Sequence, residues 1–151
     1  MTSTTFAETA TATADQLVIT GWIPGPRPSA VYRYLTEADL ITTWWSPHTE
    51  SVPEVGGVLI ARWPAEGWTM RGTYTTLDPP HLVGFTWSWD HEPDVGERRV
   101  TIELTRESDA TLLTLHHGPF SPDEAEDRES HLHGWLHFLP KLAEQFDGIT
   151  T

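Results

Sequence analysis

The stretch HLHGWLHFLPKLAEQF, residues 131–146, carries an apolar stripe at helical spacing. The stripe consists of Leu132, Trp135, Leu139, Leu142 and Phe146, which recur three or four residues apart and therefore share one side of an α-helix. The preceding SPDEAED, residues 121–127, supplies an N-cap serine, a proline at the first helical position and acidic residues for the positive end of the helix. We expect a long helix from about Ser121 to Phe146 that lays its apolar side across a sheet.

The three histidines of this helix fall on two different sides. At about 100° per residue, His131 lies on the side of Trp135, whereas His133 and His137 point away from it. His133 and His137 have the i, i+4 spacing at which two imidazoles can bind one ion, but the glutamate of a HExxH motif is missing. We interpret His133 and His137 as solvated and expect neither a metal site nor another cofactor.

The residues between His48 and Pro119 predict a meander of six antiparallel strands. Strand-length runs are separated there by the turn segments EVGG, PAEG, LDPPH, HEPDVGE and ESDA. Apolar residues alternate within the runs, and the side chains expected on the inner face are Leu59, Ala61, Trp63, Val83, Phe85, Trp87, Trp89, Val100, Ile102, Leu104, Leu113, Leu115 and His117. Gly72 could mark a bulge, which leaves the orientation of Met70 and Tyr74 open.

An earlier strand and two short helices complete the predicted architecture. QLVITGWI, residues 16–23, alternates as a strand does, and residues 24–35 and 37–45 predict short helices. The fold class is therefore α+β, with an antiparallel sheet on one long helix and room for a cavity between the layers. The Thr- and Ala-rich residues 1–14 are predicted to be a disordered N-terminal tail, and residues 15–151 a single domain.

The composition of the chain excludes several classes of function. With 9 Lys and Arg against 22 Asp and Glu, the formal net charge is -13, so phosphate backbones and anionic membrane surfaces are repelled. The absence of cysteine excludes disulfides, thiolate metal sites and thiol nucleophiles. No run approaches the ~20 apolar residues that cross a bilayer, and the first residues lack the features of a signal peptide. We expect a cytoplasmic protein that binds neither nucleic acid nor membranes.

An ordered series of short motifs resembles one protein family. The motifs are WW, GG, G-x-Y-x-x-L-D-P-P, F-T-W, H-G-x-F and H-x-x-G-W, and the similarity extends over residues 16–146. Together they resemble the START-like helix-grip (SRPBCC) superfamily, in particular its AHSA-type branch of bacterial proteins related to activators of the heat-shock-protein-ninety ATPase. The resemblance implies a curved antiparallel sheet wrapped around the long C-terminal helix, with two short helices after the first strand and an apolar cavity inside.

The resemblance also assigns positions and activities. The family pattern matches Trp44, Trp45, Gly56, Gly57, Gly72, Pro79, Pro80, Trp87, His117, His131, Gly134 and Trp135. Most of these are implied to maintain the fold: Gly56 and Gly57 set a turn, and Gly134 lets the helix approach the sheet closely. The co-chaperone activity belongs to eukaryotic members with an additional domain and is not expected here. Bacterial members of this size resemble small-molecule binding proteins, and sister groups include polyketide aromatases and cyclases.

The inward aromatic residues favour a binding site for a small apolar or aromatic molecule between helix and sheet. The residues expected to bind this ligand are Trp44, Trp63, Phe85, Trp87, Trp89, Leu115, His117, His131, Trp135 and Leu139. The two histidines would orient a polar end of the guest. The alternative for each aromatic residue is that its ring only fills the core.

Two other functions stay open at the level of sequence. A cyclase, dehydratase or lyase acting on a polyketide-like substrate would use His117 or His131 as acid or base, because imidazole titrates near neutrality. A protein-interaction module, or a homodimer, is suggested by the sheet edges and by Trp22 and Trp68, which are expected to be exposed.

Overall fold

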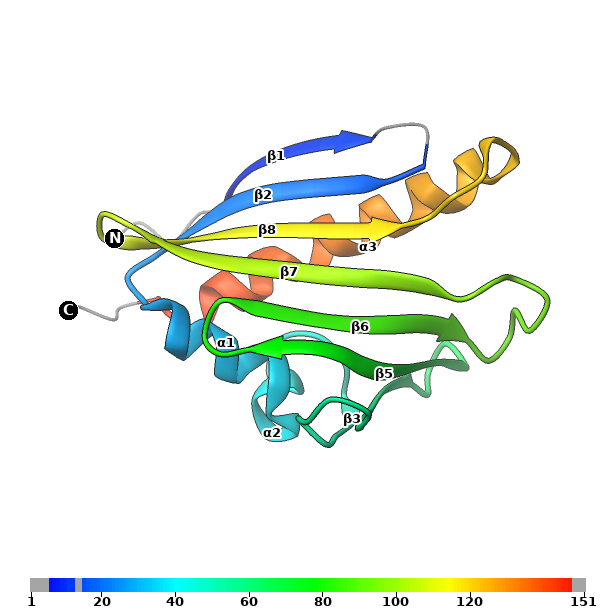
Figure 1. Cartoon of the computed structure of the whole chain (residues 1–151), viewed down its shortest axis with the longest axis horizontal. Coiled ribbons are helices and arrows are strands. Elements are labelled where there is room, and N and C mark those ends of the chain that lie inside the picture. Colours follow the sequence, from blue (N-terminus) through cyan, green and yellow to red (C-terminus); the bar gives the residue numbers. More distant parts are fainter. Residues whose placement is uncertain (1–5, 13–14, 148–151) are drawn as a thin grey trace.

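A computed structural model describes residues 6–12 and 15–147, and shows a curved antiparallel sheet packed over one long helix (Figure 1). The strands in this part of the chain are β1 (Ala7–Ala12), β2 (Leu17–Pro24), β3 (His48–Ser51), β4 (Val58–Trp63), β5 (Trp68–Asp78), β6 (Leu82–Trp89), β7 (Arg98–Glu107) and β8 (Ala110–Gly118). The helices are α1 (Pro28–Thr36), α2 (Ala38–Ile41) and α3 (Ala125–Glu144), and the 3-10 turn η1 (Pro122–Glu124) leads into α3. The predicted α+β helix-grip architecture is confirmed.

Neighbouring strands follow the order β1-β2-β8-β7-β6-β5-β4-β3. Strands β3 to β8 form the predicted meander, and β2 pairs with β8 at the end of that meander. The short helices α1 and α2 carry the chain from β2 to the opposite edge strand β3 (Figure 1). No helix in the described ranges is long and apolar enough to cross a membrane.

The described part of the predicted N-terminal tail is ordered, which corrects the sequence-based expectation. Residues 7–12 form the edge strand β1 and pair along β2. Phe6 is buried, and its ring lies over Gly21, where an added Cβ would sit 1.9 Å from the Phe6 ring. Composition concealed this strand because its pairing uses backbone hydrogen bonds, which do not depend on apolar side chains. Residues 1–5 and 13–14 of the predicted tail lie outside the described residues.

The long helix α3 packs on the sheet with the side that its spacing predicts. His131, Trp135, Leu139 and Leu142 are buried, whereas Leu132 is only half-buried. The histidines at 133 and 137 are exposed, as expected. The helix begins through η1, where the backbone N–H of Ser121 donates to the carboxylate of Glu124 at 2.8 Å.

Strand alternation also places most of the inner face as predicted. Met70 and Tyr74 are both buried, so β5 keeps its alternation through Gly72 and the register shift comes later, between Tyr74 and Thr76. Gly72 instead allows a close approach of strands, because an added Cβ would lie 2.2 Å from the carbonyl oxygen of Thr86. The turn before β4 contains Gly56 with a φ of +90°, a conformation that favours glycine.

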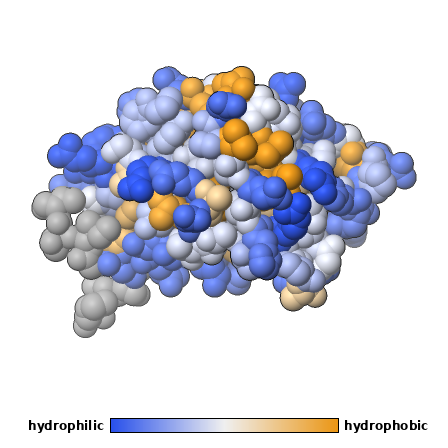
Figure 2. Space-filling view, turned by 90° about the horizontal axis from the view of Figure 1, so that it is seen from below, coloured by the Kyte–Doolittle hydropathy of each residue, from blue (hydrophilic) through white to orange (hydrophobic). Residues whose placement is uncertain are grey.

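The surface is mainly hydrophilic, in keeping with the net charge of -13. Figure 2 shows one face on which apolar residues form only separate patches. The exposed large apolar side chains among the described residues are Trp22, Val52, Val55, Val58 and Trp68. The predicted exposure of the two tryptophans is therefore confirmed.

We expect Gly72→Ala to lower the free energy of unfolding by about 2 kcal/mol, because the methyl group would push β5 away from the backbone of β6. Gly96→Ala is the control, since nothing lies within 4 Å of an added Cβ in that loop. Urea denaturation of both variants tests the expectation. A Gly72→Ala protein as stable as the Gly96→Ala protein would contradict it.

Candidate functional site

A cavity of about 230 Å³ lies between α3 and strands β4 to β6. Six of the eight tryptophans line it: Trp45, Trp63, Trp68, Trp87, Trp89 and Trp135. The other lining residues are His91, Glu92, Asp127, Ser130, His131, Gly134 and Phe138. Indole rings from the sheet, from the segment after α2 and from α3 thus meet around one space.

Stacked and tilted rings build the inner end of the cavity. Trp45 stacks on Trp135 with ring centroids 5.6 Å apart and an interplanar angle of 19°. The ring of Trp45 also meets Trp63 edge to face at 5.5 Å and lies 5.9 Å from Trp87. Alternation along β6 directs Trp87 and Trp89 to the same face, where their rings are perpendicular at 5.2 Å.

The outer end of the cavity reaches the surface beside the β6–β7 loop. Trp68 is 46% exposed there, compared with 3% for Trp135 at the inner end. His91 and Ser130 are also exposed, and the ring of His91 lies 6.4 Å from Trp68 and 5.3 Å from Trp89. A guest molecule can therefore reach the buried rings from solvent.

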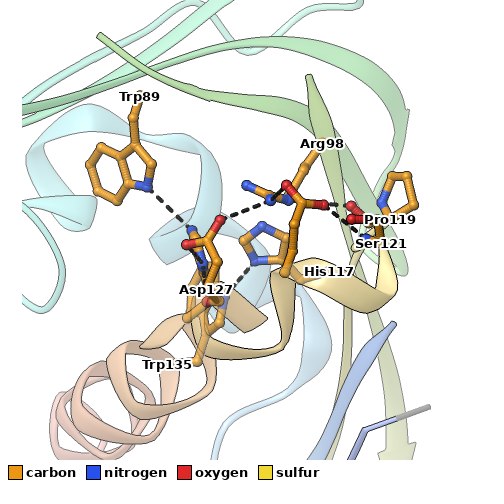
Figure 3. A network of polar contacts seen from close by, with 9 residues as sticks. Trp89, Arg98, His117, Pro119, Ser121, Asp127 and Trp135 are labelled. Atoms are coloured by element: carbon orange, nitrogen blue, oxygen red, sulfur yellow. Dashed lines mark hydrogen bonds and ion pairs between the residues drawn. The ribbon is translucent and has the colours of Figure 1, made fainter. Parts of the chain in front are cut away.

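Two buried histidines accept hydrogen bonds from the tryptophans (Figure 3). Trp89 Nε1 donates to His131 Nε2 at 3.2 Å, and Trp135 Nε1 donates to His117 Nδ1 at 2.9 Å. An indole N–H can only donate, so each accepting imidazole nitrogen carries no proton. His131 then donates from Nδ1 to the backbone oxygen of Asp127 at 2.8 Å, and both imidazoles are neutral.

Burial reinforces this neutral state. Desolvation holds the pKa of His117 well below its ordinary value, and the neighbouring His131 and Arg98 lower it further. Desolvation also lowers the pKa of His131, although its backbone hydrogen bond to Asp127 and the Asp127 charge oppose the shift. Nε2 of His117 is buried and has no hydrogen-bond partner among the described residues.

Arg98 ties the start of α3 to the sheet. Its guanidinium is buried and pairs with Glu124 and Asp127, each at 2.8 Å. The same group donates to the carbonyl of Pro119 at 3.2 Å and lies 4.3 Å from the ring centroid of Phe120. Removing one partner from such a buried group leaves a charge without compensation, so the cluster fixes the position of Asp127 and, through it, of His131.

The structure separates the predicted ligand-binding residues into two groups. Trp63, Trp87, Trp89, His131 and Trp135 line the cavity. The remaining predicted residues, Trp44, Phe85, Leu115, His117 and Leu139, are buried in the core and are not among the described lining residues. Alternation identifies the inner face of a strand, but it does not say which part of that face the helix covers. The sequence predicted Trp44 as a ligand-binding residue, but its Nε1 donates to the backbone oxygen of Tyr34 at 2.8 Å. The neighbouring Trp45, which the prediction omitted, lines the cavity instead.

Other lining residues were missed although the sequence contains a signal for some of them. Asp127, Ser130, Gly134 and Phe138 recur three or four residues apart, which forms a second stripe beside the one through Trp135. Arg98 supports the site, and it lies an even number of residues before the inward Val100, Ile102 and Leu104 on the same strand. Strand alternation alone would therefore have placed it on the inner face. The loop residues His91 and Glu92 follow no periodic pattern.

Gly134 opens the cavity, which corrects the predicted close approach of helix and sheet. Apart from its chain neighbours and the backbone of its own helix, no atom of the described residues lies within 4 Å of a Cβ added at this position. Gly134 also lines the cavity, between the turns that carry His131 and Phe138. The missing side chain therefore contributes space for a guest.

These features define a helix-grip protein with an aromatic cavity under its long helix. The family described as Activator of Hsp90 ATPase homolog 1-like protein matches residues 27–147, and the chain belongs to this family. The family expected from the ordered motifs is thereby confirmed. No match was found among curated proteins.

Solved structures show the same fold. Protein MLL2253 from Mesorhizobium loti is 25% identical, with a TM-score of 0.77, over 85% of this chain and 94% of that chain. An HSP90 activator from Plasmodium falciparum is 24% identical, with a TM-score of 0.66, over 83% and 91%. DynU16, a protein of the dynemicin biosynthetic locus, is 20% identical, with a TM-score of 0.75, over 87% of this chain and 46% of that chain.

We expect the free energy of unfolding to fall as the pH drops below 6.5, the ordinary histidine pKa. In that range the unfolded chain binds protons at His117 and His131, whereas the folded protein keeps both neutral, so protonation favours unfolding. His117→Asn retains an acceptor near the position of Nδ1 and does not titrate. Its stability should therefore depend less on pH than that of the wild type.

Urea denaturation at a series of pH values below neutrality measures this difference. His137→Asn, an exposed substitution on the far side of α3, is the control and should follow the wild type. If wild type and His117→Asn lost stability in parallel, His117 would not be the group whose protonation opposes folding.

Proposed function

We propose that the chain binds a small aromatic or otherwise apolar molecule in the tryptophan-lined cavity. The supporting observation is the cavity of about 230 Å³ among six indole side chains and beside a helical glycine. Protein interiors are close-packed, with few voids larger than a water molecule. An apolar space of this size with access to solvent is therefore better suited to a guest than to core packing alone.

The size and polarity of the cavity restrict the guest. Ligand pockets commonly enclose about 300–1,000 Å³, so this cavity fits a compact molecule of one or two rings. Six tryptophans and Phe138 make up most of its wall, which favours a mainly aromatic or apolar guest. One structural relative, DynU16, comes from a biosynthetic locus, which supports testing aromatic natural-product-like compounds.

The same geometry supports binding better than the cyclase, dehydratase or lyase reaction. A general base needs a lone pair directed at its substrate. Nε2 of His131 accepts the N–H of Trp89, and His117 is fully buried in the core. For either histidine to take a proton from a guest, an indole hydrogen bond would first have to break.

We expect Gly134→Leu to weaken the binding of 2-naphthol at least about tenfold, because the side chain would occupy the space that the guest needs. The variant should fold, since nothing lies within 4 Å of the new Cβ and leucine favours a helix over glycine by ~1 kcal/mol. Titration followed by tryptophan fluorescence and by calorimetry measures the affinity.

His133→Leu is the matched control, because it adds the same side chain to the exposed side of the same helix. It should bind 2-naphthol like the wild type. Unchanged affinity in Gly134→Leu would overturn the proposed site, and absence of saturable binding to the wild type by 2-naphthol and related aromatic probes would overturn the proposed function.

A further inference from the structure

Both charged side chains along the cavity are acidic. Glu92 approaches from the β6–β7 loop and Asp127 from α3, and no lining residue in the described chain is Lys or Arg. Asp127 shares the guanidinium of Arg98 with Glu124, so two carboxylates face one cation. Glu92 has no ion-pair partner within the described ranges. The charge around this end of the cavity is therefore negative on balance.

The walls beside these carboxylates are aromatic faces set at angles to one another. The rings of Trp63 and Trp68 each lie near Trp89, with centroids 5.8 and 5.9 Å away and interplanar angles of 57° and 59°. These rings are inclined to one another, unlike the stacked pair at the inner end of the cavity, and all three line the cavity. The face of an indole carries negative charge and attracts cations within about 6 Å of its centroid, the arrangement that recognises quaternary ammonium groups.

Among the described residues that line the cavity, none is a lysine or arginine that would oppose a cation. His131 is neutral because its Nε2 accepts the N–H of Trp89. The guanidinium of Arg98 is buried against Glu124 and Asp127 and does not line the cavity. The net charge of -13 also raises the local concentration of cations and repels anions at long range.

We infer that the cavity selects an organic cation, an ammonium group attached to a small aromatic or aliphatic body. This inference rests on the proposed binding function and specifies the class of guest. The cationic group would lie among Trp63, Trp68 and Trp89, with Glu92 beside it, and the apolar body would extend toward the buried rings. The carboxylate supplies the opposite charge, and the rings replace part of the water that a quaternary ammonium group loses.

Two probes of the same shape test the inference by calorimetry. (3-Hydroxyphenyl)trimethylammonium and 3-tert-butylphenol differ in one atom, a charged nitrogen in place of a carbon, and both carry a hydroxyl acceptor. We expect the wild-type protein to bind the cation at least about fivefold more tightly than the neutral probe, since a partly desolvated cation–π contact raises the affinity by about this factor. The neutral probe is the more apolar of the two, so burial of apolar surface alone predicts the opposite order.

Two substitutions assign the preference to this site. Glu92→Gln should weaken binding of the cation about threefold or more and leave the neutral probe nearly unchanged, as expected for loss of one nearby charge at moderate screening. Trp68→Leu should also reduce the preference for the cation. The controls are Glu144→Gln, which removes an exposed acid on α3, and Trp22→Leu, which removes an exposed tryptophan on β2, and both should match the wild type.

The outcomes separate this inference from the proposed function. If the wild type bound the neutral probe as tightly as the cation or more tightly, the cation inference would be overturned. The binding function would stand in that case if Gly134→Leu abolished the binding. Binding of neither probe would also overturn the inference, while the 2-naphthol titration decides the binding function by itself. A preference for the cation that survives both Glu92→Gln and Trp68→Leu would show that it originates elsewhere on the protein.

Discussion

The separation between α3 and the sheet depends on large rings placed between the two layers. Trp135 extends from the helix and donates its N–H to His117 on β8 at 2.9 Å, while the ring of Trp45 stacks against it at 5.6 Å. These side chains cannot be compressed, and the hydrogen bond from Trp135 to His117 forms only at this spacing. Next to them on the helix, Gly134 contributes no side chain. A cavity results from this combination of wide spacing and a missing side chain.

The electrostatics of the site follow from the same contacts. The indole N–H groups of Trp89 and Trp135 each donate to an imidazole nitrogen, so His117 and His131 are held as neutral acceptors inside the protein. Arg98 supplies the buried positive charge of this region and is already shared by two carboxylates. The wall of the cavity therefore consists mainly of aromatic rings, and its charged residues are Glu92 and Asp127. This arrangement suits recognition by shape and π-electron density more than proton transfer.

Much of the architecture was accessible from local patterns in the sequence. Alternation in β4 to β8 identified the inner face, and the spacing from His131 to Phe146 identified the side of α3 that meets it. The edge strand β1 was missed, because a strand that pairs through its backbone needs no apolar pattern. For the site, the patterns found Trp87 and Trp135 but also selected Phe85 and Leu115, which lie in the solid part of the core.

The sequence by itself determined the family, the order of the elements and which side chains are inward, because these follow from residue spacing and short motifs. Only the tertiary structure decided which inward side chains line the cavity, since that depends on where α3 crosses the sheet. It also decided that His117 and His131 accept hydrogen bonds from tryptophans distant in sequence, and that Gly134 faces open space. The physical reason is that the local backbone conformation determines the direction of a side chain. The space in front of that side chain depends on which distant elements of the fold pack opposite it.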